Sequence, residues 1–221
     1  MVGQRNITVL LAKLYAEQLI VAKEDTSPDQ LPDNIPDLML SYLNELNRNV
    51  TGDKLSDRTV HQAAKTLAWE CLKRTFRPTS AKRENALAML SAGITALNGD
   101  TAESHLKYLE TRLRLIQTIG PAQDQIRFSL DPLAEYLAGL YLLDVYGKDE
   151  QLWQQFLQDA AAMPGAPESI KGFLLAVRDC CLAKGKEAKI PDFVAEELGK
   201  LAGISPITQP PVPQIQAGIV S

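Results

Sequence analysis

The stretch that decides the fold runs from Ile126 to Leu143 and reads IRFSLDPLAEYLAGLYLL. Its first five residues alternate apolar and polar side chains, which is the pattern of a half-buried β-strand. Asp131 and Pro132 then supply an N-cap and a first-turn proline for a helix that extends to about Tyr146. Because this helix is apolar over most of its circumference, we expect it to lie at the centre of the fold.

A partner for this strand lies directly upstream. Residues 115–119 tolerate a β-conformation, and residues 120–124 read GPAQD, a sequence typical of a turn. The sequence therefore predicts a β-hairpin over 115–130, and this hairpin is the only β-structure that it indicates.

Three amphipathic segments precede the hairpin, at residues 57–75, 80–97 and 101–114. The third begins with Asp100 and Glu103, spaced as a capping box. Three helices followed by a β-hairpin is the order of a winged helix, a variant of the helix-turn-helix.

Further helices are expected on both sides of the winged helix, at residues 7–23, 35–48, 149–162, 168–184 and 191–201. The first is apolar nearly all round, so it is either a plain core helix or a helix that a preceding domain covers. The expected organisation is an N-terminal helical segment (1–55), a winged-helix-like domain (56–146), a C-terminal helical domain (147–202) and a flexible Pro-containing tail (203–221). The fold class is thus mostly α, with a helical domain, a winged helix and a C-terminal helical bundle.

Composition excludes several classes of protein. The 221 residues carry 23 Lys and Arg against 27 Asp and Glu, a net charge of −4, which argues against a general binder of nucleic acid or anionic membranes. Polar residues interrupt the apolar N-terminus, so neither a signal peptide nor a membrane span is expected. Three cysteines do not form a disulfide framework, and a cytoplasmic location is the simpler interpretation.

The sequence offers little catalytic chemistry. It contains no GxxxxGK[ST], GxSxG, HExxH, GxGxxG or CxxC motif. Cys180 and Cys181 are predicted to pack in the core rather than to act as a redox pair. His61 and His105 are predicted to be solvated or half-buried, and a dyad of either histidine with Cys71 is an alternative that nothing positions. We therefore assign no catalytic, cofactor-binding or metal site, and we expect a protein that is not an enzyme.

A free-standing winged-helix DNA-binding protein is the alternative function. In such a protein the third helix enters the major groove. The charged residues of this helix are Lys107, Arg112 and Arg114 against Glu103 and Glu110. Three bases against two acids, with no base in the hairpin turn, neutralise phosphates poorly, so the count argues against nucleic acid as a partner.

The stretch 126–143 resembles the signature that closes the winged-helix domain of NACHT-type STAND NTPases. In that family a wing strand of the form F-x-H leads into a helix reading roughly Q-E-Y/F-L-A-A. The matching residues are Phe128, Glu135, Tyr136, Leu137 and Ala138. Residues 8–20 are similar to the first helix after the nucleotide-binding domain, and residues 31–47 are similar to the helical domain next along. The resemblance covers about residues 5–146.

The sequence departs from the family pattern at two positions. Leu130 stands where the family has a His that senses the nucleotide phosphate, and Val9 stands where it has a Pro against the adenine. Neither side chain reproduces the family's contact. The P-loop and Mg²⁺-binding motifs are also absent from these 221 residues, as in a fragment or in a protein that has lost its NTPase.

The resemblance implies the C-terminal helical and winged-helix part of such an NTPase. That part would be a non-catalytic regulatory or protein-interaction module. It would pack on a P-loop nucleotide-binding domain, in cis or in trans, and control its open/closed switch or its oligomerisation. The expected partners are that domain and further copies of the chain, with no cofactor and no membrane.

Overall fold

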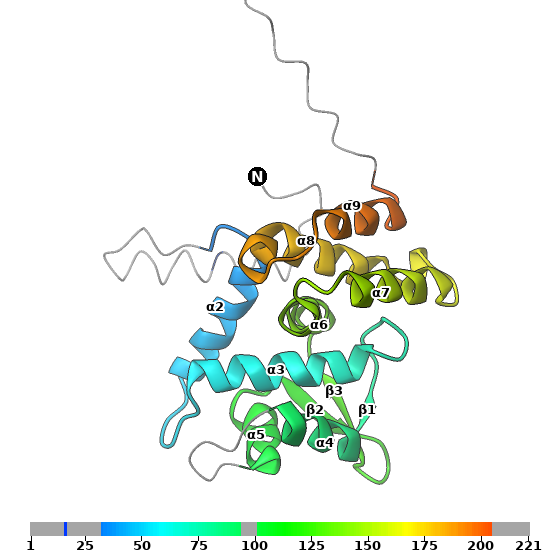
Figure 1. Cartoon of the computed structure of the whole chain (residues 1–221). Coiled ribbons are helices and arrows are strands. Elements are labelled where there is room, and N and C mark those ends of the chain that lie inside the picture. The colour runs from blue at the N-terminus through cyan, green and yellow to red at the C-terminus, as the bar shows by residue number, and fades with distance from the viewer. Residues whose placement is uncertain (1–15, 17–31, 94–100, 205–221) are drawn as a thin grey trace, which may run out of the picture.

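The computed structural model describes residues 16, 32–93 and 101–204, which form a mostly helical fold with one small sheet (Figure 1). The helices of this part of the chain are α2 (Ile35–Arg48), α3 (Asp57–Leu72), α4 (Arg83–Gly93), α5 (Ala102–Lys107), the π-helix η2 (Tyr108–Arg112), α6 (Asp131–Tyr146), α7 (Glu150–Ala162), the 3₁₀-helix η3 (Glu168–Ile170), α8 (Lys171–Ala188) and α9 (Asp192–Leu201). The strands are β1 (Ala81–Lys82), β2 (Ile116–Ile119) and β3 (Gln125–Phe128).

Helix α6 lies at the centre of the fold, with α3 on one side and α8 on the other (Figure 1). Nine of its 16 residues are buried, which confirms the central position expected from its apolar sequence. Its end at Tyr146 is also as predicted. The N-cap, however, is Leu130 and not Asp131, because Leu130 keeps the extended backbone of the preceding strand (φ −131°, ψ 109°).

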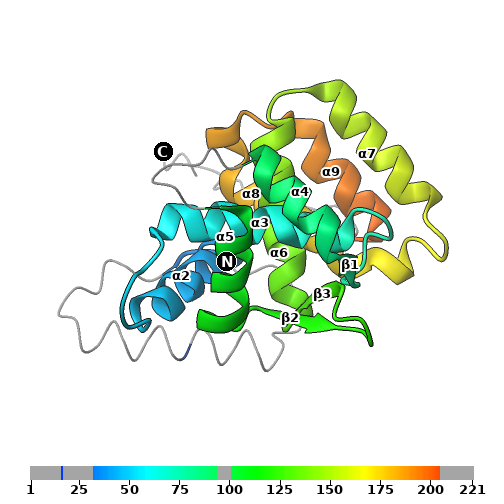
Figure 2. The same cartoon turned by 90° about the horizontal axis from the view of Figure 1, so that it is seen from below.

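The winged helix consists of α3, α4 and α5 followed by the β2–β3 hairpin. The sheet, α4 and α5 lie on the opposite side of α3 from α7, α8 and α9 (Figure 1). The hairpin is antiparallel, with Ile116 opposite Phe128 and Ile119 opposite Gln125. Figure 2 shows the hairpin at the edge of the molecule, beside α6. The predicted hairpin is therefore confirmed, and it delivers the chain directly to the start of α6.

The sheet has a third strand that the sequence did not indicate. Ala81 pairs with Ile126 and Lys82 with Gln125, so the strand order is β1-β3-β2. The prediction that the hairpin is the only β-structure was wrong, because a two-residue strand is too short to show a period of two. The same pairing makes α4 begin at Arg83 and not at residue 80, as predicted.

The third helix differs from the prediction at both of its ends. Its cap is Thr101 with Ser104, and each side chain accepts a hydrogen bond from the other residue's backbone N–H, at 3.1 Å and 2.9 Å. Asp100 lies outside the described residues, and the carboxylate of Glu103 binds another partner. After Lys107 the helix continues with π-helical hydrogen bonding, a local widening that is frequent at functional sites.

Two other helix ends also differ from the prediction. Helix α3 ends at Leu72, because Phe76 takes a left-handed backbone (φ 51°) that places its ring in the core. The segment predicted at 168–184 begins with η3 and continues as α8 to Ala188, where Lys189 ends it in the left-handed conformation. The helices predicted at 149–162 and 191–201 are confirmed by α7 and α9 to within one residue.

Helix α2 confirms the prediction for residues 35–48 and packs against α3, α6 and α8. Buried apolar residues from Leu38 to Ala202 form the core cluster. The expected boundaries at residues 55, 146 and 202 stay predictions. The helix expected at 7–23, apart from Ala16, and the tail beyond residue 204 lie outside the described residues, as does Val9.

Candidate functional site

The residues that match the NACHT signature lie where the wing passes into α6. Phe128 is 3% exposed at the end of β3, and Tyr136, Leu137 and Ala138 on α6 are fully buried. The structure therefore brings most of the signature into the core. The Glu135 carboxyl and the Tyr136 hydroxyl, its polar groups, face α8.

Glu135 lies against the first turn of α8. This helix begins at Lys171, and the preceding residue, Ile170, gives it no side-chain cap. A Cβ atom built on Gly172 would lie 2.9 Å from Oε2 and 3.0 Å from Cδ of Glu135, so the carboxyl group fills the space that a side chain would need. A carboxylate beside a helix N-terminus is favourable because the first N–H groups and the helix dipole are positive there.

A second set of contacts joins the same two helices about two turns further along α8. The Tyr136 hydroxyl donates to Oδ2 of Asp179 at 2.7 Å, and the Cys180 thiol donates to the Tyr136 carbonyl at 3.6 Å. Gly139 permits a close approach, since a Cβ there would lie 3.2 Å from Sγ of Cys180 and 3.3 Å from Cα of Val177. We call this contact between α6 and α8 the α6–α8 joint.

The effects of substitutions at Glu135 and Gly172 are expected to be coupled, because the carboxyl group of one fills the space beside the other. In the wild type, Gly172→Ala must displace the Glu135 carboxyl group, which offsets the gain of up to about 1 kcal/mol that alanine brings to a helix. In a Glu135→Ala background the same change meets no obstacle and is expected to stabilise the protein. Urea denaturation of the four variants in a double-mutant cycle measures the difference, expected at about 1 kcal/mol. Additive effects of the two substitutions would contradict the placement of Glu135.

An aromatic cluster extends the joint to α3 and α7. The ring of Phe173 on α8 lies 5.7 Å from Phe76, 6.1 Å from Phe156 and 6.4 Å from Trp69, measured between ring centroids. These separations are those of interacting aromatic pairs. The winged helix and the C-terminal helices thus share one set of packed rings.

A shallow hollow of about 450 Å³ opens on the outer side of the hairpin, next to the start of α6. Its lining includes Gln117, Arg127, Leu130 and Asp131. The guanidinium of Arg127 lies 3.1 Å from the Asp131 carboxylate. Leu130, at the position of the family's sensing His, is half-buried on its wall. Apolar and polar groups both line the hollow, and the Arg127–Asp131 ion pair is among them.

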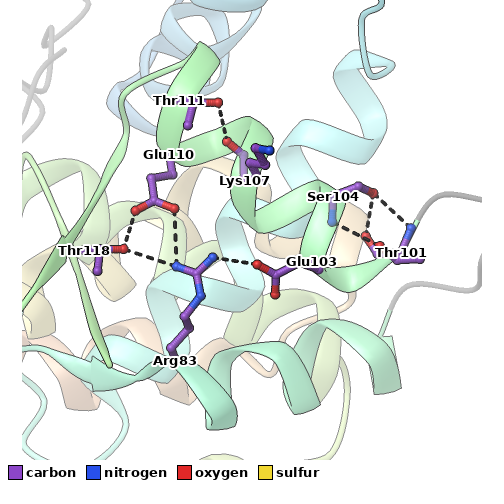
Figure 3. Close-up of polar contacts among 8 residues, drawn as sticks. All are labelled: Arg83, Thr101, Glu103, Ser104, Lys107, Glu110, Thr111 and Thr118. Carbon is purple, nitrogen blue, oxygen red and sulfur yellow. Dashed lines mark hydrogen bonds and ion pairs between the residues drawn. The ribbon is translucent and has the colours of Figure 1, made fainter. Parts of the chain in front are cut away.

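Arg83 ties the third helix to the rest of the winged helix (Figure 3). From the first residue of α4, its guanidinium donates to Glu103 at 2.8 Å and to both Glu110 (3.3 Å) and Thr118 (3.2 Å). The Thr118 hydroxyl also donates to Glu110. No sequence pattern indicated this arrangement, because the residues are distant along the chain and share no motif.

Asn47 is a second polar residue that the sequence did not single out. It is 4% exposed, and its amide donates to the Leu55 carbonyl at 2.9 Å and to the Asp57 carboxylate at 2.6 Å. Its carbonyl oxygen accepts from the Tyr108 hydroxyl at 2.6 Å. One buried amide therefore connects α2, the start of α3 and the π-helix.

The two histidines lie in different environments. His61 is half-buried as predicted, with Nε2 2.6 Å from Oδ1 of Asn44, and its pKa is lowered by burial and then by Lys65. His105 is only 3% exposed, so the prediction of a solvated or half-buried side chain was wrong. It follows the cap at Thr101 by one turn and shares the inward face of α5 with Leu106.

The cysteines are buried and form no disulfide. Burial raises the pKa of Cys71 to about 12, with a further contribution from Glu70, and burial raises the pKa of Cys181 to about 12 as well. Cys180 lies in the α6–α8 joint. These positions favour core packing over thiol chemistry.

The thiols are accordingly expected to be inert in the folded protein. A raised pKa lowers the thiolate fraction at neutral pH, and burial blocks access, so 5,5′-dithiobis(2-nitrobenzoate) should react with none of Cys71, Cys180 and Cys181. In guanidinium chloride all three should react. The release of thionitrobenzoate measures both results, and rapid reaction of any thiol in the native protein would contradict this account of the cysteines.

The described residues contain no group of three or more His, Cys, Asp and Glu side chains that could hold a metal ion. Among these residues no helix combines the length and the apolar character needed to cross a bilayer.

Comparison with known proteins adds one finding. Residues 162–206 match the family model of NACHT C-terminal Helical domain 4. No curated protein and no solved structure matches the chain. The matched segment contains α8 and α9, so this part of the chain is similar to a domain of the C-terminal helical region of NACHT proteins. Through α8 the matched segment packs against α6, which contains most of the stretch at 126–143. The match therefore supports the resemblance independently.

Proposed function

We propose that the chain is a non-catalytic regulatory module of a cytoplasmic NACHT-type signalling NTPase. It packs on a P-loop nucleotide-binding domain, in cis or in trans, and controls the open/closed switch of that domain or its oligomerisation. The observation that carries the proposal is the α6–α8 joint. It unites the winged-helix signature at Glu135 and Tyr136 with the segment that matches the NACHT helical model.

The architecture supports this role because a switch needs a body that moves as a unit. The rings around Phe173 and the contacts of Tyr136 bind the winged helix to α8. A nucleotide that favours one position of such a body then moves the far end of the module as well.

The hollow at Leu130 is the surface on which we expect the nucleotide-binding domain to pack. The resemblance puts the family's nucleotide-sensing residue there. Leu130 cannot donate a hydrogen bond to a phosphate, so contact with the domain itself, rather than with the nucleotide, is the expected means of regulation.

A binding experiment tests the proposed function. The 221-residue chain is titrated calorimetrically into the NACHT nucleotide-binding domain from the same organism, loaded either with ADP or with a non-hydrolysable ATP analogue. The two affinities are expected to differ at least about tenfold, which corresponds to about 1.4 kcal/mol of bias on the switch. Equal affinities would overturn the proposal, because a ligand-independent contact shifts no equilibrium.

Variants on and off the hollow refine the test. Leu130→Glu is expected to weaken binding to the favoured form. Lys186→Glu, an exposed change of charge on α8, is the matched control and should leave the affinity unchanged. Equal effects of both variants would place the contact elsewhere.

A further inference from the structure

The third helix presents a cationic face that its sequence alone conceals. Lys107 at the end of α5, Thr111 and Arg112 on η2, and Arg114 two residues beyond η2 are all exposed. The two acids of this helix, Glu103 and Glu110, point instead toward Arg83 and bind it (Figure 3). Among the described residues no carboxylate forms an ion pair with any of the three bases.

Arg83 changes which charges of the third helix remain unpaired at the surface. Counted along the third helix, three bases face two acids. Once Arg83 has bound both acids, the exposed face carries Lys107, Arg112 and Arg114 without a carboxylate in ion-pair contact. The Arg83–Glu110 pair is half-buried and lies toward β2, where Thr118 bonds to both side chains, and Glu103 is exposed but bound to Arg83.

We propose that this face is a docking surface for the phosphate backbone of double-stranded nucleic acid, with Lys107, Arg112 and Arg114 as its contacts. The occupant follows from the architecture and the charge together. In winged-helix proteins of this layout the third helix is the element that approaches the duplex, and its phosphate contacts come from Lys, Arg and hydroxyl groups. The binding is nonspecific in sequence, because phosphate contacts position a protein without reading bases. This activity is separate from packing on a nucleotide-binding domain, which we assign to the hollow at Leu130.

The salt dependence of binding gives a quantitative test. The full chain is titrated into a fluorescein-labelled DNA duplex and followed by anisotropy. Three phosphate contacts predict a slope of log K against log salt of about −2.7, which is about a 40-fold loss of affinity between about 50 mM and about 200 mM salt.

Matched variants locate the surface. The triple variant Lys107→Gln, Arg112→Gln, Arg114→Gln is expected to lose binding at about 50 mM salt, and each single variant should reduce the slope by about 1. The control triple variant Arg74→Gln, Lys148→Gln, Lys186→Gln removes three exposed charges elsewhere and should bind as the wild type does. Circular dichroism establishes that both triples are folded, and Lys107→Arg, Arg112→Lys, Arg114→Lys should retain binding.

Three outcomes would overturn the proposal. They are the absence of binding at low salt, equal losses in the two triple variants, and equally tight, equally salt-dependent binding of polyglutamate. The last result would assign the face to an acidic protein partner. None of them bears on the nucleotide-dependent binding test, so the two proposals fail independently.

Discussion

Replacing Phe173 by alanine is expected to lower the free energy of unfolding by about 3–5 kcal/mol. The side chain is fully buried, and its ring contacts those of Trp69, Phe76 and Phe156. Its removal deletes buried apolar surface and leaves a cavity that rigid aromatic neighbours close poorly. Because a domain is typically stable by about 5–15 kcal/mol, a loss of this size would unfold a large fraction of the protein on mild heating.

Urea denaturation followed by circular dichroism measures the loss. The matched control is Phe193→Ala on α9, whose side chain is only partly buried, so a smaller loss is expected. Trp69 on α3 reports the winged helix by fluorescence in a Trp153→Phe variant, and Trp153 on α7 reports the C-terminal helices in a Trp69→Phe variant. Unfolding of one group of helices at lower urea than circular dichroism shows for the same variant would contradict the shared core.

Replacing Asn47 by alanine is expected to lower the free energy of unfolding by about 2–3 kcal/mol. The change removes a buried partner of the Tyr108 hydroxyl, and it also removes the amide that donates to the partly buried Leu55 carbonyl and to the Asp57 carboxylate. Asn49→Ala is the control. Its side chain is exposed and bonds to Glu45, so we expect a change within about 0.5 kcal/mol.

A double variant separates the contribution of Tyr108. Tyr108→Phe removes the hydroxyl that loses its Asn47 acceptor in Asn47→Ala, so the two changes together should cost less than the sum of the single changes. Additive losses would show that the hydroxyl does not depend on Asn47.

The elements that could be predicted were those whose sequence pattern is long and periodic. Helix α6, the hairpin and α2 follow from apolar periodicity and from Pro132 or the turn at 120–124, because local sequence determines them. Strand β1 could not be predicted, since only its pairing with Ile126 and Gln125 makes it a strand.

In the candidate site, too, some residues could be identified from the sequence, whereas their tertiary contacts could not. Glu135 and Tyr136 were identified through the family pattern, but their contacts with α8 could not be, because they depend on how two helices distant in sequence cross. Arg83 and Asn47 belong to no motif. Their hydrogen-bond partners come from other elements and are brought together only by tertiary packing. His105 was placed wrongly because a single histidine gives no information on which face of a short helix is inward.

The cationic face illustrates the limit of counting charges. Glu103 and Glu110 offset Lys107 and Arg112 in the sequence, yet in the structure they bind Arg83. Composition gives the net charge of a segment, whereas recognition depends on which charges remain unpaired at the surface.

The central claim, that this chain is the regulatory module of a NACHT NTPase, is tested most directly by isolating the native protein from its source cells. An antibody to the chain is used for affinity purification, and the purified material is analysed by immunoblot and peptide mass spectrometry. We predict that the chain is recovered with a GxxxxGK[ST] polypeptide, either in one band well above 24.3 kDa or as a stoichiometric partner. Recovery of a 24.3 kDa protein without any P-loop polypeptide would contradict the account.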